Sequence, residues 1–465
     1  MREPLWTSAE IVAATGGVLV GEAFAATGVS IDTRTIEPGD LFVALAGARD
    51  GHEFIEQALA SGAVGALATQ PGAGARIMVG DTLTALEALG VAARERAPKA
   101  RRGAVTGSVG KTSVTQAIAA ALALAGPSHT SVKSYNNHIG VPLTLARMPR
   151  ETERAVFEIG MNHADEIVPL SRMVLPHAAA ITTVGPVHVE NFPDGEIGVA
   201  RAKAEIFAGM GPGGVAILNA DNQWFELLKD EAARASCEVW AFGSGPACKA
   251  RLLDIAAEPD GLRIGAEIKG RRLNVPLRQT GVQWGLNSLA VLLMLEALDV
   301  DLDVGLAALA SFAPLEGRGT ETSVAIDGGD FTLIDDSFNA NSLSMTAALK
   351  TLGARPATGR RIVALTDMLE LGDISPGLHA ALAEPIAQAS VDLVFCAGPL
   401  MRSLWEALPP TRRGGYADDA AGLEPRLVEA IRPGDVVLVK GSKGSRAGAL
   451  AKALAGMAAG AGDMG

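Results

Sequence analysis

A short glycine-containing turn, Thr106-Gly-Ser-Val-Gly-Lys-Thr112, constrains the fold of this chain more than any other segment. It lies between an apolar segment at 103–105, which predicts a strand, and one at 111–125, which predicts a helix. Gly107 and Gly110 let consecutive backbone N–H groups point inward at anionic oxygens, and the start of a helix favours negative charge. The turn therefore predicts a phosphate-binding loop in an α/β domain.

Two side chains extend this prediction to a nucleoside triphosphate. Lys111 can reach the β- and γ-phosphates, and the hydroxyl of Thr112 can bind Mg²⁺. The spacing is GxxGKT rather than GxxxxGKT, because position 105 is Val. The alternative is an ordinary glycine turn with a solvated lysine, but the strand–turn–helix setting favours binding of ATP or GTP. The loop contacts are expected from Thr106, Gly107, Ser108, Val109, Gly110, Lys111, Thr112 and Ser113.

Short apolar segments alternate with helical ones, which is typical of parallel, doubly wound sheets. With 465 residues, the chain is long enough for two to four domains. We expect three α/β domains, at 1–98, 99–313 and 314–465, with a hinge at 313–319. After Cys237 we expect shorter, more polar strands. Strands are predicted at 40–45, 103–105, 155–159, 178–184, 215–218, 331–334, 361–365, 393–396 and 435–439, and an apolar patch lies at 63–68. Helices are predicted at 53–61, 83–95, 111–125 and 286–298, with a linker at 96–102.

Charge and cysteine content exclude several classes of protein. Lys and Arg number 40 against 52 Asp and Glu, so the net charge of −12 argues against general nucleic-acid binding. Three cysteines without a CxxC pair indicate a reducing compartment rather than a disulfide framework. No signal peptide is recognisable, and no apolar run reaches the roughly 18 residues that span a bilayer. We expect a cytoplasmic protein without membrane insertion.

Three polar residues after the loop are candidate metal or catalytic groups. Glu158 ends an apolar strand, and ligands of doubly wound sheets gather at the carboxyl ends of strands, so it can hold Mg²⁺ opposite the phosphate loop. A solvent-facing strand end is the alternative. His188 also follows a buried-type strand, although a lone histidine is more often structural. Lys203 lies in a helical stretch, where a lysine is nearly always a solvated charge.

These residues, in this order, resemble the Mur ligase family of ATP-dependent amide-forming enzymes. Asp32-Thr-Arg34, Gly39–Leu45 and Asp50-Gly-His-Glu-Phe54 resemble its uridine-nucleotide-binding domain. The stretch Ser134–Thr144 is similar to the substrate loop that follows the phosphate-loop helix. Asp335-Asp-Ser-Phe-Asn-Ala-Asn341 and Asp367-Met-Leu-Glu-Leu-Gly372 resemble the C-terminal motifs of the member that adds a D-alanyl-D-alanine dipeptide. The resemblance covers essentially the whole chain.

The resemblance implies a three-domain fold and a reaction. The domains are a small α/β domain that binds a uridine nucleotide, a central doubly wound ATPase domain and a C-terminal Rossmann-like α/β domain. The implied reaction joins D-alanyl-D-alanine to UDP-N-acetylmuramoyl-tripeptide through an acyl phosphate, in cytoplasmic peptidoglycan precursor synthesis. The implied partners are these two small molecules, and by analogy the chain is a monomer.

The resemblance also implies residue roles and cofactors. ATP and two Mg²⁺ ions are implied, with Thr112 and Glu158 on one ion and His188 and a carbamylated Lys203 on the second. The implied nucleotide contacts beyond the loop are Asn287, Arg318 and Asp336. Catalytic roles fall to Lys111, His188, Lys203 and Arg318, and substrate binding to Thr33, Arg34, Asn136 and Asn137.

Several positions depart from the family pattern. Gln283-Trp284 stands where many relatives have His-Asn, so adenine packing is open there. Phe338 replaces a common Tyr, Ser342 a usual Pro and Thr33 a usual Ser. None of these changes touches the phosphate or metal positions.

Three alternative functions remain beside this one. They are the related ligase that adds the third residue, a folate polyglutamate synthetase, and a nucleotide-binding regulatory module without catalysis. The chain lacks the Asp-Asn-Pro-Arg motif of many third-residue ligases, and it has a first domain that folate enzymes lack. The joint presence of Lys111, Thr112, Glu158, His188 and Lys203 argues against a regulatory module. The diamino acid of the tripeptide and the residues that select the dipeptide are not predicted.

Overall fold

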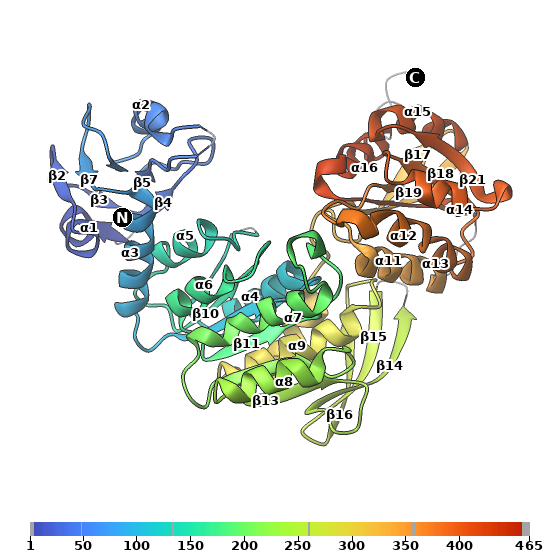
Figure 1. The fold of residues 1–465 in the computed structure, drawn as a ribbon, viewed down its shortest axis with the longest axis horizontal. Helices are drawn as coiled ribbons and strands as arrows, with labels where there is room; N and C mark the ends of the chain where they lie inside the picture. Colours follow the sequence, from blue (N-terminus) through green and yellow to red (C-terminus); the bar gives the residue numbers. More distant parts are fainter. Residues whose placement is uncertain (1–3, 48, 133, 259–260, 356–358, 458–465) are drawn as a thin grey trace.

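The computed structural model describes residues 4–47, 49–132, 134–258, 261–355 and 359–457. The chain forms three lobes, each built around its own main sheet (Figure 1). The N-terminal lobe and the C-terminal lobe rise from the same side of the central lobe, at opposite ends of the molecule (Figure 1). The expected α/β architecture of three parts is confirmed.

The N-terminal lobe holds a five-stranded sheet in the order β2-β7-β6-β5-β4. Only β2 runs antiparallel to its neighbour. Strands β5 and β6 are buried along their whole length, which explains their apolar sequences. The elements are β1 (Trp6–Thr7), α1 (Ser8–Thr15), β2 (Val18–Val20), β3 (Ala25–Ala26), β4 (Gly28–Ser30), β5 (Asp40–Val43), α2 (Ile55–Ala60), β6 (Gly65–Ala68), β7 (Arg76–Met78) and α3 (Thr82–Glu95).

The central lobe holds a nine-stranded sheet in the order β16-β15-β14-β13-β12-β11-β8-β10-β9. All pairs from β9 to β14 are parallel. Adjacent residues of β8, Ala104 and Val105, enter two different hydrophobic clusters, one on each face of the sheet. Helices therefore cover both faces, as a doubly wound sheet requires. The strands are β8 (Arg101–Thr106), β9 (Ser128–Thr130), β10 (Arg154–Glu158), β11 (Ala178–Ile181), β12 (Val215–Asn219), β13 (Glu238–Gly243), β14 (Ala250–Glu258), β15 (Gly261–Ile268) and β16 (Arg271–Leu277).

Seven helices belong to this lobe, counted among the described residues. Helix α4 begins at Lys111 and ends at Ala125, as the sequence predicts. Helix α9 is buried along most of its length and forms much of one face's core. The helices are α4 (Lys111–Ala125), α5 (Gly140–Ala146), α6 (Ile167–Val174), α7 (Glu196–Ala204), α8 (Phe225–Arg234), α9 (Trp284–Ala297) and α10 (Leu302–Ser311).

The expectation of shorter strands after Cys237 is wrong. Strands β14 and β15 have 9 and 8 residues, and with β16 they extend the sheet as an antiparallel meander. Most of β14 is exposed, and its apolar residues do not alternate regularly with polar ones, so the sequence lacks the pattern of a half-buried strand. The predicted linker at 96–102 is also too long, because β8 begins at Arg101. The guanidinium of Arg102 donates to the carbonyls of Ala100 and Val174, each at 2.9 Å, so this buried charge is tolerated in the strand.

The C-terminal lobe holds a six-stranded sheet in the order β17-β18-β22-β19-β20-β21. Only the β17–β18 pair is antiparallel. The carboxyl ends of β18 and β22 line a cavity together with the phosphate loop of the central lobe. The elements are β17 (Thr320–Ile326), β18 (Gly329–Asp336), α11 (Ser342–Ala354), β19 (Arg361–Thr366), α12 (Ser375–Ala380), α13 (Ala383–Gln388), β20 (Leu393–Ala397), α14 (Arg402–Ala407), β21 (Arg413–Ala417), α15 (Ala420–Ala430), β22 (Val436–Lys440) and α16 (Ala447–Ala455).

None of the helices within the described ranges is both long and apolar enough to cross a membrane.

Candidate active site

The phosphate loop has the backbone that its glycines predict. Gly107 has a φ of +145°, and a Cβ on it would lie 2.0 Å from Thr182 Oγ1, so no other residue fits without rearrangement. Gly110 has a φ of +89° and leads directly into α4. The hydroxyl of Ser108 donates to the carbonyl of Gly185 at 3.1 Å, which ties the loop to the segment after β11. These contacts fix the backbone of the loop at the N-terminus of helix α4.

Lys111 and Thr112 stand at the start of α4, facing the cleft. The Lys111 Nζ donates to the carbonyl of Gly107 at 2.7 Å, which folds the side chain back over the loop. Burial lowers the pKa of Lys111, and the Glu158 carboxylate opposes that shift. The hydroxyls of Thr112 and Ser134 lie 2.9 Å apart. This arrangement places a cation and a hydroxyl where triphosphate oxygens would lie.

Glu158 is a buried carboxylate at the carboxyl end of β10. Its side chain is in a residue only 1% exposed, and its Oε1 accepts from Asn136 Nδ2 at 2.6 Å. The other oxygen, Oε2, is buried and has no hydrogen-bond partner among the described residues. A buried, unpaired carboxylate oxygen is costly unless a cation binds it. The donor chemistry here fits a divalent cation shared with the Thr112 hydroxyl and triphosphate oxygens.

Lys203 lies on α7 and is only 2% exposed. No described residue forms a hydrogen bond or an ion pair with its Nζ. Burial lowers the pKa of Lys203 well below its ordinary value, and the charge of Lys111 adds to the shift. The amine is therefore favoured in its neutral, nucleophilic form. The prediction of a helix at this position is confirmed, whereas the general expectation that a helical lysine is solvated fails here.

His188 stands between the central and C-terminal lobes. Its backbone is left-handed, with a φ of +58°, and its Nδ1 lies 2.6 Å from Glu370 Oε2, within ion-pair distance but outside hydrogen-bond geometry. Burial lowers the pKa of His188, the Glu370 carboxylate opposes the shift, and Lys111 and Lys203 reinforce it. The ring therefore lies within electrostatic range of both lysines.

The C-terminal lobe supplies the other wall of the cleft. The guanidinium carbon of Arg318 lies 3.9 Å from the ring centroid of Phe338. Burial lowers the pKa of Arg318, opposed by the carboxylates of Glu158 and Asp336. Arg318 thus lies between carboxylates of two lobes.

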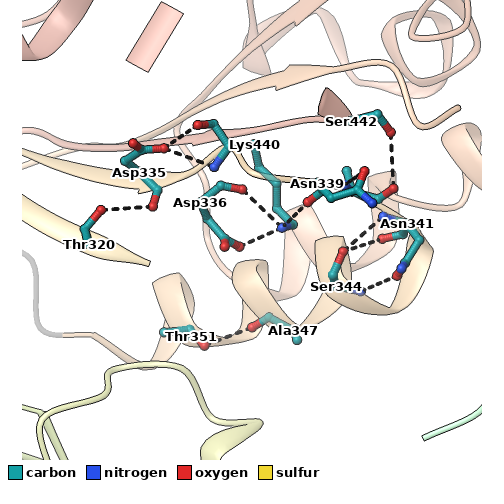
Figure 2. A network of polar contacts seen from close by, with 12 residues as sticks. Thr320, Asp335, Asp336, Asn339, Asn341, Ser344, Ala347, Thr351, Lys440 and Ser442 are labelled. Carbon is teal, nitrogen blue, oxygen red and sulfur yellow. Dashed lines mark hydrogen bonds and ion pairs between the residues drawn. The ribbon is translucent and has the colours of Figure 1, made fainter. Parts of the chain in front are cut away.

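Asp336 is held by a buried lysine at the end of β22. Lys440 is 2% exposed; its Nζ lies 2.7 Å from Asp336 Oδ2 and donates to the Asn339 carbonyl at 3.0 Å (Figure 2). Burial raises the pKa of Asp336, and the positive charge of Lys440 opposes the shift. Asn341 caps α11 through Ser344 in the same network (Figure 2). The strand end of Asp336 is therefore rigid.

A cavity of about 320 Å³ is lined by residues of the central and C-terminal lobes. It is lined by most of the predicted nucleotide and metal residues: Ser108, Val109, Gly110, Lys111, Thr112, Ser113, Asn136, Glu158, Asn287, Arg318 and Asp336. Its lining does not include Thr106, Gly107, Asn137, His188, Lys203, Thr33 or Arg34. Gln283, Trp284 and Phe338, which depart from the family pattern, also line it.

The predicted substrate residues lie on the N-terminal side of the cleft. Arg34 is largely exposed and pairs with Asp32 at 2.7 Å. Tyr135, in the loop that carries Asn136, is close enough to raise the pKa of Arg34, although the Asp32 carboxylate is the main cause of that shift. Asn137 Oδ1 accepts from the backbone of Gly140 at 2.9 Å at the start of α5, so this side chain has a structural contact as well.

Sequence reasoning missed Lys440, Ser134 and Glu370 as neighbours of the site. Lys440 directly follows the predicted strand at 435–439, so its place at a carboxyl strand end was a usable signal. Ser134 and Glu370 lie in the motifs at 134–144 and 367–372 that resemble those of the family, but neither was given a role of its own. Within the described residues, no three His, Cys, Asp or Glu side chains form a ready metal cluster.

Models of three family domains match the chain in order. They are the Mur ligase family catalytic domain at residues 25–116, the Mur ligase middle domain at 105–295 and the glutamate ligase domain of Mur ligases at 322–443. The matches include the phosphate loop, Glu158, Lys203 and Asp336.

Full-length relatives agree. The chain is 35% identical to an Escherichia coli protein named UDP-N-acetylmuramoyl-tripeptide--D-alanyl-D-alanine ligase, over 94% of this chain and 96% of the relative. It is 33% identical to the Bacillus subtilis protein of the same name, over 90% and 91%. A crystal structure of MurF from Acinetobacter baumannii is 28% identical, superposes with a TM-score of 0.85, and covers 97% of this chain and 99% of its own. The chain belongs to the Mur ligase family.

Proposed function

We propose that this chain is an ATP-dependent ligase that joins D-alanyl-D-alanine to UDP-N-acetylmuramoyl-tripeptide, in cytoplasmic peptidoglycan precursor synthesis. The observation that carries the proposal is a cleft in which a phosphate loop, a buried unpaired carboxylate and an arginine from the hinge face one another. The names of relatives matched over nearly the full chain supply the substrates.

The chemistry needs activation of an acid. A carboxylate does not react with an amine at neutral pH, because oxide is a poor leaving group. One oxygen of the tripeptide carboxylate attacks the γ-phosphorus of ATP, and ADP leaves, giving an acyl phosphate. The dipeptide nitrogen then attacks the acyl carbon, loses a proton, and expels phosphate as the amide forms.

The residues of this chain serve mainly to position and to stabilise charge. The amides of 107–113 and Lys111 bind the phosphates, and Arg318 adds a cation from across the cleft. Asn287 and Asp336 would contact the nucleoside, with Asp336 on the ribose and Lys440 holding it in place. Thr33, Arg34, Asn136 and Asn137 would bind the uridine-linked substrate, from the N-terminal lobe and the neighbouring loop.

Polar groups in the cleft and beside it would hold two Mg²⁺ ions. Thr112 and Glu158 would hold one, which accounts for the unpaired Glu158 Oε2. His188 and a carbamylated Lys203 would hold the second. When bound, these ions neutralise the charge that develops on the transferred phosphoryl group.

Carbamylation of Lys203 follows from its surroundings. The neutral amine nitrogen adds to the carbon of CO₂ and loses a proton to solvent, so a neutral side chain becomes an anionic carbamate. A buried lysine without a partner gains a negative charge that a divalent cation can bind, whereas an ammonium there would repel the metal.

A phosphate-release assay tests the proposed reaction. The purified chain is given ATP, Mg²⁺ and UDP-N-acetylmuramoyl-tripeptide, with D-alanyl-D-alanine, D-glutamate or a diamino acid as the amine. We expect release of phosphate in equal amount to a new amide only with the dipeptide. Equal or greater release with a single amino acid, or with a folate in place of the nucleotide-linked peptide, would refute the assignment.

A further inference from the structure

The contact between His188 and Glu370 joins two lobes at one side chain. His188 begins the turn η2 (Val189–Asn191) of the central lobe, and Glu370 lies in the loop 367–374 of the C-terminal lobe. A Cβ on Gly372 of that loop would lie 3.0 Å from Glu190 Cβ. The two segments are therefore packed closely, and the 2.6 Å approach of Glu370 Oε2 to His188 Nδ1 is part of a formed interface.

Both partners have backbones that L-residues rarely adopt. Glu370 has a φ of +63° and His188 a φ of +58°. Such residues persist where the surrounding structure fixes them, and they gather at functional sites. The left-handed backbones of these two residues therefore indicate that the surrounding structure fixes their positions at this point of the interface.

The loop that carries Glu370 is fastened to its own lobe. The backbone N–H of Met368 donates to His379 Nε2 at 3.0 Å, and that of Leu369 donates to Ser442 Oγ at 3.0 Å. Asp367 Oδ1 accepts from Met401 at 2.9 Å. The position of the Glu370 carboxylate thus follows the position of the whole C-terminal lobe.

We infer that Glu370 is a positioning residue for the His188 imidazole, so that the site for the second divalent cation is completed only when the C-terminal lobe is docked. The negative charge of Glu370, 2.6 Å from Nδ1, favours a proton on that nitrogen and therefore the tautomer whose Nε2 lone pair is free for a metal. No described residue hydrogen-bonds Nε2. The inference rests on the proposed role of His188 at the second metal ion.

The orientation of the His188 imidazole therefore depends on both the central and the C-terminal lobe. The central lobe supplies the ring and Lys203, and the C-terminal lobe supplies the carboxylate that orients the ring. Metal binding and lobe docking are then thermodynamically linked, because each favours the other. The cation would be bound most tightly when the cleft is assembled for phosphoryl transfer.

Mn²⁺ binding to the full chain, with a non-hydrolysable ATP analogue, tests this inference. Histidine is labelled with ¹⁵N, free Mn²⁺ is counted by EPR, and nitrogen coupling is read by electron spin-echo methods. The variants are Glu370→Gln and, as the matched control, Asp373→Asn, which removes an exposed carboxylate from the same loop. His188→Asn identifies which histidine gives the coupling.

We expect Glu370→Gln to weaken the histidine-coordinated Mn²⁺ about 10- to 100-fold and to reduce its nitrogen coupling, with Asp373→Asn unchanged. Unchanged affinity and coupling in Glu370→Gln would overturn the inference. An equal loss of Mn²⁺ affinity in both variants would also overturn it, because the negative charge of the loop, and not the position of Glu370, would then explain the effect. Absence of nitrogen coupling in the unmodified chain would show that His188 does not bind the metal, and would overturn the inference. The proposed ligase activity is tested independently, by phosphate release.

Discussion

The two junctions of the central lobe differ in what holds them together. The N-terminal lobe shares a hydrophobic core with α5, through Leu143 and Ala146, and Trp6 Nε1 donates to the Ala146 carbonyl at 2.8 Å. Arg96 stacks 3.8 Å above Trp6, and Arg147 donates to the Val29 carbonyl at 2.6 Å. This junction is a buried, continuous part of the core.

The C-terminal lobe meets the central lobe mainly through side chains around a cavity. Among the described residues, these contacts include the His188–Glu370 pair, the backbone of Val282 donating to Thr351 Oγ1 at 3.1 Å, and Leu343 against Gly185. Gly317 and Gly319, with φ of +67° and +85°, lie in the connecting segment. Cores resist sliding, whereas polar contacts can exchange with water. From this difference we expect a fixed N-terminal platform and a C-terminal lobe that opens and closes over the cleft.

The largest expected effect is on catalysis in the cleft. Lys203→Ala should lower the rate of amide synthesis by at least about 10³-fold, because the anionic ligand that carbamylation supplies is lost. The chain should stay folded, since Lys203 has no polar partner among the described residues. The rate is measured with and without added bicarbonate, which should not restore it. Near-normal turnover would contradict the carbamate.

The second prediction compares how much each junction contributes to the free energy of unfolding. Trp6→Ala should lower the free energy of unfolding by roughly 3–5 kcal/mol, because it empties a site that is 2% exposed and shared by two lobes. Leu343→Ala, at the other junction and 38% exposed, should cost less than about 1 kcal/mol. Denaturant unfolding of both variants measures the difference, and equal losses would erase the contrast.

Acid should weaken the platform. His129 Nε2 lies 2.7 Å from the Thr144 carbonyl of α5, and burial lowers the pKa of His129 to about 4, with that hydrogen bond opposing the shift. Between pH 6.5 and about 4 the unfolded chain binds a proton that the folded chain does not. The free energy of unfolding therefore decreases as the pH is lowered, and this group accounts for roughly 1–2 kcal/mol of the decrease at pH 5. His129→Gln should remove that part of the fall, and an unchanged slope would exclude it.

The smallest expected effect is a change of distance. Nitroxide pairs at 18 and 124 report the N-terminal junction, and pairs at 124 and 418 report the C-terminal one, all at exposed positions on a cysteine-free background. A non-hydrolysable ATP analogue with the tripeptide substrate should alter only the second distance distribution. Identical distributions for 124 and 418 in all states would argue against hinge motion at 317–319, and a shift between 18 and 124 would argue against the fixed platform.

The sequence predicts those parts of the site that follow from local rules. The phosphate loop and helix α4 could be predicted because a glycine turn between a strand and a helix has few solutions. Glu158 could be predicted because it ends a buried strand. The motifs at 335–341 and 367–372 indicated the C-terminal partner of the cleft.

Other features depend on contacts that sequence does not encode locally. Nothing on helix α7 itself marks Lys203 as buried; its burial comes from how the helix is packed. The apolar and polar residues of the largely exposed strand β14 do not alternate regularly, so the antiparallel extension of the sheet was not expected. Glu370 acquires its importance from His188, 182 positions earlier in the numbering, and only lobe packing brings the two together.

Isotope transfer from acid to phosphate addresses the proposed reaction most directly. UDP-N-acetylmuramoyl-tripeptide labelled with ¹⁸O in its terminal carboxylate is incubated with the chain, ATP, Mg²⁺ and D-alanyl-D-alanine, and the released phosphate is analysed by mass spectrometry. Activation as an acyl phosphate predicts one ¹⁸O in each phosphate released with amide formation. Phosphate that carries no ¹⁸O while the amide forms would contradict it.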